Sequence, residues 1–340
     1  MVPAPTTARE VHLRRRPVGS PGPEDFVVVE APVREPDEGE VVVVNQFLSV
    51  DPYMRGRMSD APSYAVPYVV GEVMYGGAVG TVVSSRAPEL AEGDVVVHQL
   101  GWRECTVLRA TQCSPVDTAL APASAYLGVL GMPGMTAYVG LTEIGGMREG
   151  DVVFVSGAAG AVGGLAGQLA RQLGASRVIG SAGSPAKVDH VTRALGFDAG
   201  FDYHDGSVAE LLAAAAPDGI DVYFDNVGGT HLEAALGSMR DFGRVICCGA
   251  ISTYNDLGPT PGPANMRFLV SKRLRLRGFI VSDHGALAGE FRRVVGGWLA
   301  AGQIRSEETV VDGIDHAVDA FLGLFRGDNL GKMVVRLGDR

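Results

Sequence analysis

The chain of 340 residues is long enough for about two domains, and its composition, 46% hydrophobic and 20% charged, is that of an ordinary soluble globular protein. The formal net charge of -10 argues against a general nucleic-acid-binding or anionic-membrane surface, because both partners repel an acidic chain. Any phosphate that the protein binds must therefore be held by a local arrangement of donors.

The first residues, MVPAPTTAREVHLRRRP, contain no apolar segment of signal-peptide type, and no stretch approaches about 18 uninterrupted apolar residues. We therefore expect a cytoplasmic protein with no membrane partner. The cysteines show no paired framework, which fits a reduced compartment, and we expect no disulfides. They are Cys105, Cys113, Cys247 and Cys248.

Residues 1 to about 125 alternate short β-rich runs with turns and show almost no helical periodicity. This pattern favours a compact β domain of barrel type. The three arginines Arg14 to Arg16 fit either a phosphate contact or a solvated strand edge. The predicted strands are Phe26 to Glu30, Glu40 to Ser49, Gly71 to Ser84 and Asp94 to Gln99.

The segment SVDPYMRGRM, Ser49 to Met58, directly follows one of these strands. A loop in this position can deliver Tyr53 to a cleft, and a tyrosine packed at a turn is the alternative. From Leu120 to Thr142 the pattern becomes helical, with an interruption at Pro133, and we place the domain boundary near residue 128.

A strand, a glycine turn and a helix follow in succession. Val152 to Val155 is a short apolar run, typical of a strand buried on both faces of a parallel sheet. Gly157, Gly160 and Gly163 place residues without side chains where a helix N-terminus must approach both a ligand and its own strand. The backbone amides at 161–164 suit a dinucleotide pyrophosphate, and a glycine turn without a ligand is the alternative.

The second strand of this unit ends in GSAGSPAK, Gly180 to Lys187. At this position an acidic residue binds the adenosine ribose hydroxyls of NAD. Here there is no carboxylate, and Lys187 arrives within one turn of the next helix. That combination suits a 2′-phosphate and favours NADPH over NADH, with a surface lysine as the alternative.

Further alternation of strands and helices predicts a doubly wound parallel sheet, whose ligands lie at the carboxyl ends of the strands. The strand ends of interest are Ser181 to Lys187, Asp225 to Gly229 and Gly249 to Tyr254. The predicted elements are a helix to Leu195, a strand Ala199 to Asp202, a helix Ser207 to Ala216, a strand Asp221 to Asp225, a helix Thr230 to Arg240 and a strand Gly243 to Cys247.

The stretch Asp256 to Pro263, DLGPTPGP, predicts a mobile loop that could cover a site. Arg273 to Gly278 alternates charged and apolar residues and predicts a strand that ends the sheet or pairs with its copy in a dimer. After a helix at 285–301, the terminal strand, helix (Ile314 to Phe325) and strand (Lys332 to Leu337) are expected to pack on the first domain.

Zinc ligands are not predicted, because the cysteines lack C-x-x-C spacing and the seven histidines are scattered. Without a metal, a polarised carbonyl must be stabilised by hydrogen-bond donors. Tyr254 lies just beyond a strand end, beside the predicted mobile loop, and its hydroxyl is a neutral donor near pH 7. A loop tyrosine that only packs is the alternative.

The motifs GAAGAVGG, GSAGSPAK, YFDNVGG, CGAISTYN and GDNLGK, with DPYMRGRM and GVLGMPGMTAYVGL upstream, resemble those of the zinc-independent medium-chain dehydrogenase/reductases. The most similar branch contains prostaglandin reductases, plant alkenal double-bond reductases and bacterial curcumin-reductase-like enzymes. The resemblance covers nearly the whole chain. It implies a GroES-like β-barrel catalytic domain at 1–128 completed by 308–340, a Rossmann domain at 129–307, NADPH as cofactor, and a homodimer.

By matching motif, the resemblance also implies site residues. Lys187 and Tyr203 would lie near the 2′-phosphate, Tyr254 would be the proton relay or enolate stabiliser, and Tyr53 would line the substrate cleft. The remaining implied cofactor contacts are Ala161, Val162, Gly163 and Gly164 at the pyrophosphate, and Asn226, Cys248, Gly249, Ala250, Ile251, Ser252, Thr253, Phe279, Ile280, Val281 and Asn329 along the nicotinamide half.

The activity that these observations favour is NADPH-dependent reduction of the C=C bond of α,β-unsaturated aldehydes or ketones. Hydride would pass to the β-carbon while Tyr254 holds the developing enolate oxygen. NADPH:quinone reduction on the same scaffold is one alternative. A sensor or structural protein that binds NADPH without turnover is an alternative of another class.

Overall fold

The computed structural model describes residues 4–338, which form two compact units. Unit 1 contains the chain up to Leu127, the segment Glu308–Asp328 and the residues from Lys332 onward. Unit 2 contains Gly128–Glu307 and the short segment Asn329–Gly331. The predicted catalytic role of the first domain stays a prediction.

Unit 1 is built on a seven-stranded sheet in the order β14-β15-β3-β4-β5-β7, with β6 also paired to β3, and on a separate β1-β2 pair. The central strand β3 carries four consecutive valines, and its long apolar run is bonded to three neighbours. The strands are β1 Thr7–Leu13, β2 Phe26–Pro32, β3 Glu40–Ser49, β4 Ala78–Ser85, β5 Val95–His98, β6 Cys105–Arg109, β7 Ser114–Pro115, β14 Glu308–Asp312 and β15 Lys332–Arg336, and the α-helices are α1 Met54–Arg57 and α9 Ala317–Arg326.

One predicted strand of this unit begins later than expected, and some strands were missed. The strand predicted from Gly71 begins only at Ala78, because Gly71 adopts a positive φ of 87° and the chain stays irregular as far as the glycine pair before β4. Strands β1 and β6 were not predicted. Strand β1 mixes charged with apolar residues and β6 has only five residues, so neither has a strong local pattern.

A buried lysine ties the end of the chain into unit 1. Lys332, at the start of β15, donates from Nζ to the Val50 and Met333 carbonyl oxygens at 2.6 and 2.9 Å. It also forms an ion pair with Asp51 at 3.0 Å, with both side chains buried. Because a buried charge must be paired and hydrogen-bonded, this contact fixes the C-terminal strand against the segment that leads to Tyr53.

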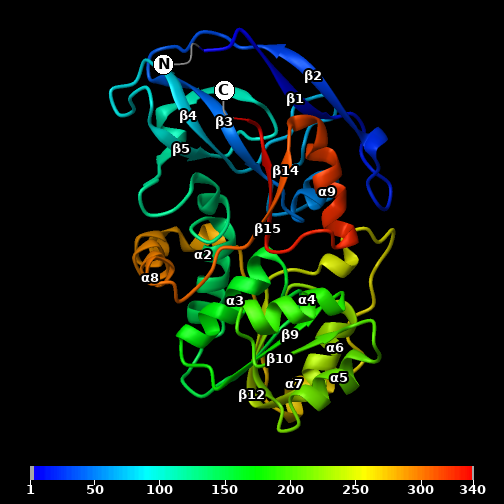
Figure 1. Ribbon diagram of the computed structural model, residues 1–340. Coiled ribbons are helices and arrows are strands. Elements are labelled where there is room, and N and C mark those ends of the chain that lie inside the picture. Colours follow the sequence, from blue (N-terminus) through cyan, green and yellow to red (C-terminus); the bar gives the residue numbers. More distant parts are fainter. Residues whose placement is uncertain (1–3, 339–340) are drawn as a thin grey trace. The chain divides into compact units, whose positions relative to one another are not determined.

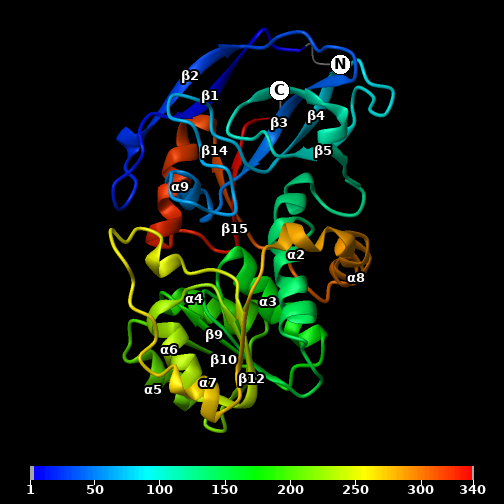
Figure 2. The ribbon, with the colours of Figure 1, turned by 180° about the vertical axis from the view of Figure 1, so that it is seen from behind.

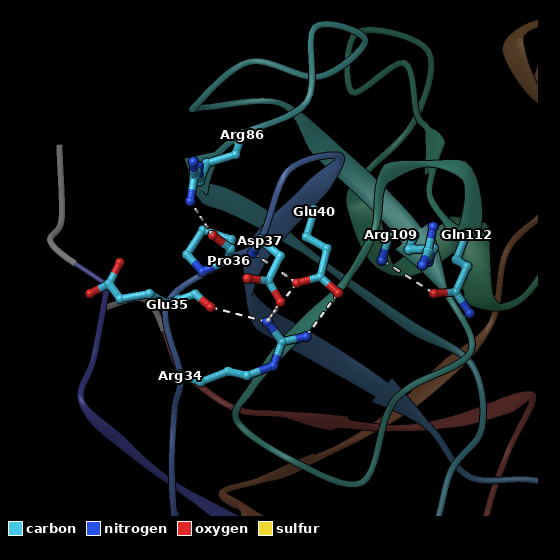
Figure 3. A network of polar contacts seen from close by, with 8 residues as sticks. All are labelled: Arg34, Glu35, Pro36, Asp37, Glu40, Arg86, Arg109 and Gln112. Atoms are coloured by element: carbon cyan, nitrogen blue, oxygen red, sulfur yellow. Dashed lines mark hydrogen bonds and ion pairs between the residues drawn. The ribbon is translucent and has the colours of Figure 1, made fainter.

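A polar network precedes β3 (Figure 3). The Arg34 guanidinium donates to both carboxylate oxygens of Glu40, at 2.5 and 2.8 Å, and the backbone N–H of Asp37 donates to Glu40 as well. These donors lower the pKa of Glu40 to about 2. The charged form of Glu40 therefore closes the turn from which β3 starts.

Unit 2 contains a six-stranded parallel sheet in the order β10-β9-β8-β11-β12-β13. In Figure 1, helices α3 to α6 surround its strands. The strands are β8 Val152–Val155, β9 Arg177–Ala182, β10 Ala199–Asp202, β11 Ile220–Asp225, β12 Met239–Cys247 and β13 Arg275–Gly278. The α-helices are α2 Met132–Val139, α3 Ala161–Gln172, α4 Pro185–Asp189, α5 Val208–Ala215, α6 Gly229–Ser238, α7 Arg267–Ser271 and α8 Ala288–Ala300.

The strand order reverses between β8 and β11, which are neighbours although two strands separate them in the chain. This reversal is the topological switch point of a doubly wound Rossmann sheet, where ligands bind beyond the carboxyl ends of the strands. On one face of the sheet the Phe154 ring stacks on Tyr223 at 5.0 Å and on Phe201 at 5.8 Å. The sheet interior is therefore rigid and apolar beneath the strand ends.

The helical prediction for Leu120 to Thr142 was only partly right, because the segment is divided into a 3₁₀ turn at Ala123–Leu127, helix α2 and a π-type turn at Gly140–Ile144. Helix α2 lies beside α8 in both views (Figure 1 and Figure 2), and Tyr138 donates to Glu290 at 2.6 Å between them. The predicted end of the helix before β12 was also wrong, since Met239 already starts that strand.

His98 on β5 is a buried neutral side chain whose tautomer is set by its partners. The Leu100 N–H donates to Nδ1 at 3.1 Å, so Nε2 carries the proton and donates to the Asn45 Oδ1 at 2.8 Å. Asn45 donates in turn to the Arg103 carbonyl at 2.9 Å, which fixes the orientation of its amide. Burial lowers the pKa of His98 to about 4.

Acidification should therefore destabilise the fold. Because the pKa of His98 is lower in the folded than in the unfolded state, the neutral ring contributes to the free energy of unfolding. That contribution is complete above pH 6.5, the ordinary histidine value, and is lost as pH falls through 4. The loss expected from His98 alone is about 1.4 kcal/mol per pH unit in that window. Urea unfolding at pH 7, 5.5 and 4.5 measures it, and His98→Gln should flatten the dependence.

The exposed His316 provides the matched control, since His316→Gln should leave the pH dependence of the wild-type protein intact. His231 of unit 2 is also buried, and burial lowers its pKa to about 4, so His98→Gln removes only part of the dependence. An unchanged slope in His98→Gln would contradict the role assigned to His98.

Candidate cofactor and active site

The glycine turn lies between β8 and α3. Its glycines are required by backbone conformation at one position and by close packing at another. Gly157 has a positive φ of 61°. A Cβ on Gly163 would lie 2.3 Å from the Gly157 carbonyl oxygen, so the first turn of α3 packs directly on the backbone of the turn. The Ala158 N–H donates to the Ser181 carbonyl at 2.9 Å, which joins the turn to β9.

Helix α3 begins without a side-chain cap, because its N-cap residue is Gly160. The first amides of a helix have no intrahelical acceptor, and at Ala161 and Val162 the chain is partly exposed. This arrangement fits a pyrophosphate, because backbone donors and the positive end of the helix dipole lie together at the start of α3.

The segment Asn329–Gly331 belongs to unit 2 because it is bonded to the same turn. The Gly331 N–H donates to the Ala159 carbonyl at 2.8 Å, and Gly160 and Gly331 form an isolated parallel bridge. The Asn329 side chain donates to the Gly331 carbonyl at 2.8 Å. The tertiary structure thus brings the GDNLGK motif to the glycine turn, although the two are far apart in the chain.

Lys187 lies in α4, the helix that follows β9, and Tyr203 directly follows the neighbouring strand β10. Ser184 caps α4, and its Oγ accepts from the Lys187 N–H at 3.3 Å. A Cβ on Gly183 would lie 2.8 Å from the Tyr203 hydroxyl, so Tyr203 reaches over the loop that carries Lys187. The edge of the buried His231 ring supports Tyr203 at 5.3 Å. The Tyr203 hydroxyl thus lies over Gly183, four positions before Lys187, and the contact of both residues with a 2′-phosphate stays a prediction.

Asn226 follows β11 and faces the end of β8. Its side chain donates to the Ser156 carbonyl at 2.8 Å, and its backbone N–H donates to the Ser156 Oγ at 3.0 Å. Next to it, the buried Asp225 carboxylate accepts from the Tyr223 hydroxyl at 2.7 Å. Sequence reasoning marked Asp225 to Gly229 as a strand end of interest but did not identify Ser156 or Tyr223, because their contacts depend on which strands are neighbours.

Tyr254 ends the segment that follows β12. The Cys248 and Gly249 N–H groups donate to the Asp225 carbonyl at 2.9 and 3.0 Å. A Cβ on Gly249 would lie 3.2 Å from the Tyr254 hydroxyl, and the Ala250 N–H points to that hydroxyl at 3.5 Å. The half-buried phenol therefore folds back over the residues at the strand end.

The two adjacent cysteines are poor nucleophiles. Burial raises the pKa of the Cys247 thiol to about 11 and that of the Cys248 thiol to about 12. Because the thiolate is the reactive form, both side chains are protonated near pH 7. All four cysteines are free thiols.

Phe279, Ile280 and Val281 follow β13, which pairs with β12 so that Gly278 lies opposite Cys247. They therefore leave the sheet at the same edge as Cys248, and the Phe279 ring contacts the edge of His284 at 6.4 Å. All predicted cofactor residues thus lie in unit 2, and those outside the glycine turn and α3 follow the carboxyl ends of its strands or belong to Asn329–Gly331.

Tyr53 lies in unit 1, at the start of α1. The Arg57 guanidinium stands over its ring at 5.2 Å and over the ring of Tyr75 at 5.1 Å. Burial raises the pKa of Tyr53, so its hydroxyl is neutral and can donate. The sequence predicted the tyrosine but not its arginine and aromatic neighbours.

Two absences concern only the part of the chain that the structure describes. Within residues 4–338, no three or more His, Cys, Asp or Glu side chains are grouped so that they could hold a metal ion. In the same residues, no helix combines the length and apolar character that a membrane crossing requires.

Comparison with known proteins agrees with this geometry. Residues 9–116 match the family described as the N-terminal domain of oxidoreductase, and residues 161–296 match the family described as zinc-binding dehydrogenase. The chain is 42% identical over 330 residues to the NADPH-dependent curcumin reductase of Escherichia coli (strain K12), covering 96% of this chain and 95% of that protein. It is 40% identical over 333 residues to the 2-alkenal reductase (NADP(+)-dependent) of Nicotiana tabacum, covering 96% of each.

The fold is similar to the crystal structure of CurA from Vibrio vulnificus in complex with NADPH, with a TM-score of 0.93 and 40% identity over 98% of this chain and 100% of that chain. This similarity confirms the predicted fold class, a GroES-like β-barrel domain with a Rossmann sheet domain. Prostaglandin reductase 1 of Rattus norvegicus is 38% identical over 99% of this chain. The chain therefore belongs to the medium-chain dehydrogenase/reductase family, in the NADP-dependent oxidoreductase branch that includes curcumin, alkenal and prostaglandin reductases.

Proposed function

We propose that this protein reduces the C=C bond of α,β-unsaturated aldehydes or ketones with NADPH. The observation that carries the proposal is the position of Tyr254, whose hydroxyl lies against Gly249 and Ala250 just beyond the end of β12. A neutral donor at the carboxyl edge of a dinucleotide-binding sheet is suited to a carbonyl oxygen that becomes negative during reduction. The names of the curcumin and alkenal reductases point to substrates of the same class.

NADPH, when bound, supplies the hydride that adds to the β-carbon of the substrate. The role of Tyr254 is to donate a hydrogen bond to the carbonyl oxygen as that oxygen gains enolate character, which lowers the barrier only if the bond is stronger in the transition state. Protonation of the α-carbon then completes the reduction. Tyr53 contributes a second neutral phenol, proposed to line the substrate cleft.

The cofactor preference is assigned to the loop after β9. The backbone amides of Ala161 to Gly164 hold the pyrophosphate, and Lys187 and Tyr203 hold the 2′-phosphate. The net charge of the chain is -10, and the positive charge of Lys187 provides local attraction for the 2′-phosphate. Asn226, the segment 248–254, Phe279 to Val281 and Asn329 are assigned to the nicotinamide half.

We further propose that the protein is a cytoplasmic homodimer. Strand β13 ends the parallel sheet and has β12 on one side, so its other edge is available to a second copy. Sedimentation at several concentrations tests the dimer independently of activity.

Removal of the Lys187 charge should change cofactor preference. Losing a charge-assisted hydrogen bond costs about 1.5–3 kcal/mol, so Lys187→Ala should raise the KM for NADPH roughly tenfold to a hundredfold and leave the KM for NADH nearly unchanged. Arg193→Ala is the matched control, because Arg193 is an exposed cation that pairs with Asp189 one turn earlier. Equal effects of Lys187→Ala on both cofactors would refute the assignment.

Removal of the Tyr254 hydroxyl should slow the chemical step. Loss of one such donor typically costs about 100- to 1000-fold in turnover, so Tyr254→Phe should lower kcat with a 2-alkenal by that range and leave NADPH affinity near normal. Tyr138→Phe, which loses a hydrogen bond to Glu290 elsewhere in unit 2, should retain activity.

The same three proteins, wild type, Tyr254→Phe and Tyr138→Phe, should be assayed with a quinone. Preference of the wild-type protein for quinones over alkenals would favour quinone reduction instead. Tight NADPH binding with no oxidation across a panel of enones, enals and quinones would favour a non-catalytic binding protein. Unchanged alkenal turnover in Tyr254→Phe would remove the tyrosine from the mechanism.

A further inference from the structure

Asp225, the last residue of β11, is a buried carboxylate to which the proposed chemistry assigns no step. Its side chain is 2% exposed. One oxygen, Oδ1, accepts from the Tyr223 hydroxyl at 2.7 Å, from the Gly228 N–H at 2.8 Å and from the Val227 N–H at 3.0 Å. The Ser156 hydroxyl approaches the same oxygen at 3.4 Å. A single buried acceptor thus organises the residues that leave the strand.

The backbone of the same residue holds the next strand end. The Asp225 carbonyl accepts from the Cys248 and Gly249 N–H groups at 2.9 and 3.0 Å. Side chain and main chain of Asp225 therefore bind both loops that are assigned to the nicotinamide half of the cofactor, the loop at 226–229 and the loop at 248–254.

The two loops are also bonded to each other along their length. The Ile251 N–H donates to the Asn226 carbonyl at 3.2 Å, and Ser252 donates to the Val227 carbonyl from its N–H at 3.2 Å and from its Oγ at 2.6 Å. The loop at 226–229 therefore acts as a template on which the segment leading to Tyr254 is folded.

Two glycines allow this close approach. Gly228 has a φ of 73°, and a Cβ there would lie 3.0 Å from the Cβ of Ala250. Gly229 has a φ of 52°, and a Cβ there would lie 3.2 Å from the Ser252 Oγ. Both glycines have a positive φ, which side chains disfavour. The Asp225 carboxylate accepts from the Val227 and Gly228 N–H groups and so holds the backbone at this point.

We propose that Asp225 is a positioning residue whose carboxylate oxygen sets the geometry of both loops at the nicotinamide end of the site. The inference rests on the proposed function in one respect, the assignment of 226 and 248–254 to the nicotinamide half. Burial raises the pKa of Asp225, and the Tyr223 hydroxyl and the two backbone donors oppose that rise. The acceptor oxygen, and not a proton transfer, is what the site requires.

The test separates the two ends of the cofactor. NADPH carries both ends, whereas adenosine 2′,5′-bisphosphate carries the adenosine and the 2′-phosphate without the nicotinamide. Asp225→Leu removes the acceptor at similar volume and should weaken NADPH about tenfold or more. The bisphosphate should bind within about twofold of its wild-type Kd. Titration calorimetry on the intact protein measures both ligands without any substrate.

Asp225→Asn is the rescue variant, because an amide oxygen can accept from the same three donors. It should bind NADPH within about threefold of the wild-type protein. Lys187→Ala gives the opposite signature and should weaken both ligands, since both carry the 2′-phosphate. If Asp225→Leu does not fold, Tyr223→Phe removes one donor at constant shape and should raise the Kd of NADPH alone by about threefold to fivefold. Tyr138→Phe should change neither Kd.

Equal weakening of NADPH and the bisphosphate in the folded variants would overturn the proposal, because a general structural role predicts that result. Unchanged NADPH affinity in Tyr223→Phe, or an Asp225→Asn variant as weak as Asp225→Leu, would also overturn it. These outcomes are independent of enone turnover, so failure of the Tyr254→Phe experiment refutes the mechanism and leaves this inference to its own test.

Discussion

The backbone hydrogen bonds from Cys248 and Gly249 to the Asp225 carbonyl hold the ends of β11 and β12 side by side, and the rest of the site in unit 2 depends on that contact. It continues the pairing of the two parallel strands for one more step beyond the sheet. These bonds fix the backbone from which the segment leading to Tyr254 starts.

Electrostatics explain how an acidic protein holds a phosphate-rich cofactor. A net charge of -10 repels anions at long range, so the affinity must come from short-range donors. In the function proposed above, the amides at the start of α3 and the charge of Lys187 are such donors.

The position of the C-terminal strand in unit 1 depends on the buried ion pair of Lys332 and Asp51. Lys332 closely follows the segment Asn329–Gly331, which is bonded to the glycine turn of unit 2, yet it is itself fixed in unit 1. Breaking a buried pair by removing one partner leaves an uncompensated charge and costs about 3–5 kcal/mol. The position of the chain end in unit 1 is thus secured by electrostatics as well as by strand pairing.

The sequence by itself determined the features that have a local cause. Apolar runs bounded by glycine predicted β8 and the turn after it, and the strand Ala199–Asp202 was predicted with its observed bounds. The absence of a carboxylate at 180–187 indicated NADPH, in agreement with the NADP-dependent relatives, whereas the donor role of Tyr254 stays a prediction. Hydrophobic periodicity and the backbone freedom of glycine depend only on residues close together in the chain, so both can be seen in the sequence.

Only the tertiary structure decided which distant groups become partners. Ser156 meets Asn226 at a separation of 70 positions, and nothing in the local pattern specifies that β8 lies beside β11. The same applies to the pairing of Arg57 with Tyr53 and Tyr75, and to the joining of Gly331 to Ala159. A buried polar contact is set by strand order and register, which arise from the packing of the whole unit, so the residues that position the site become visible only when the fold is complete.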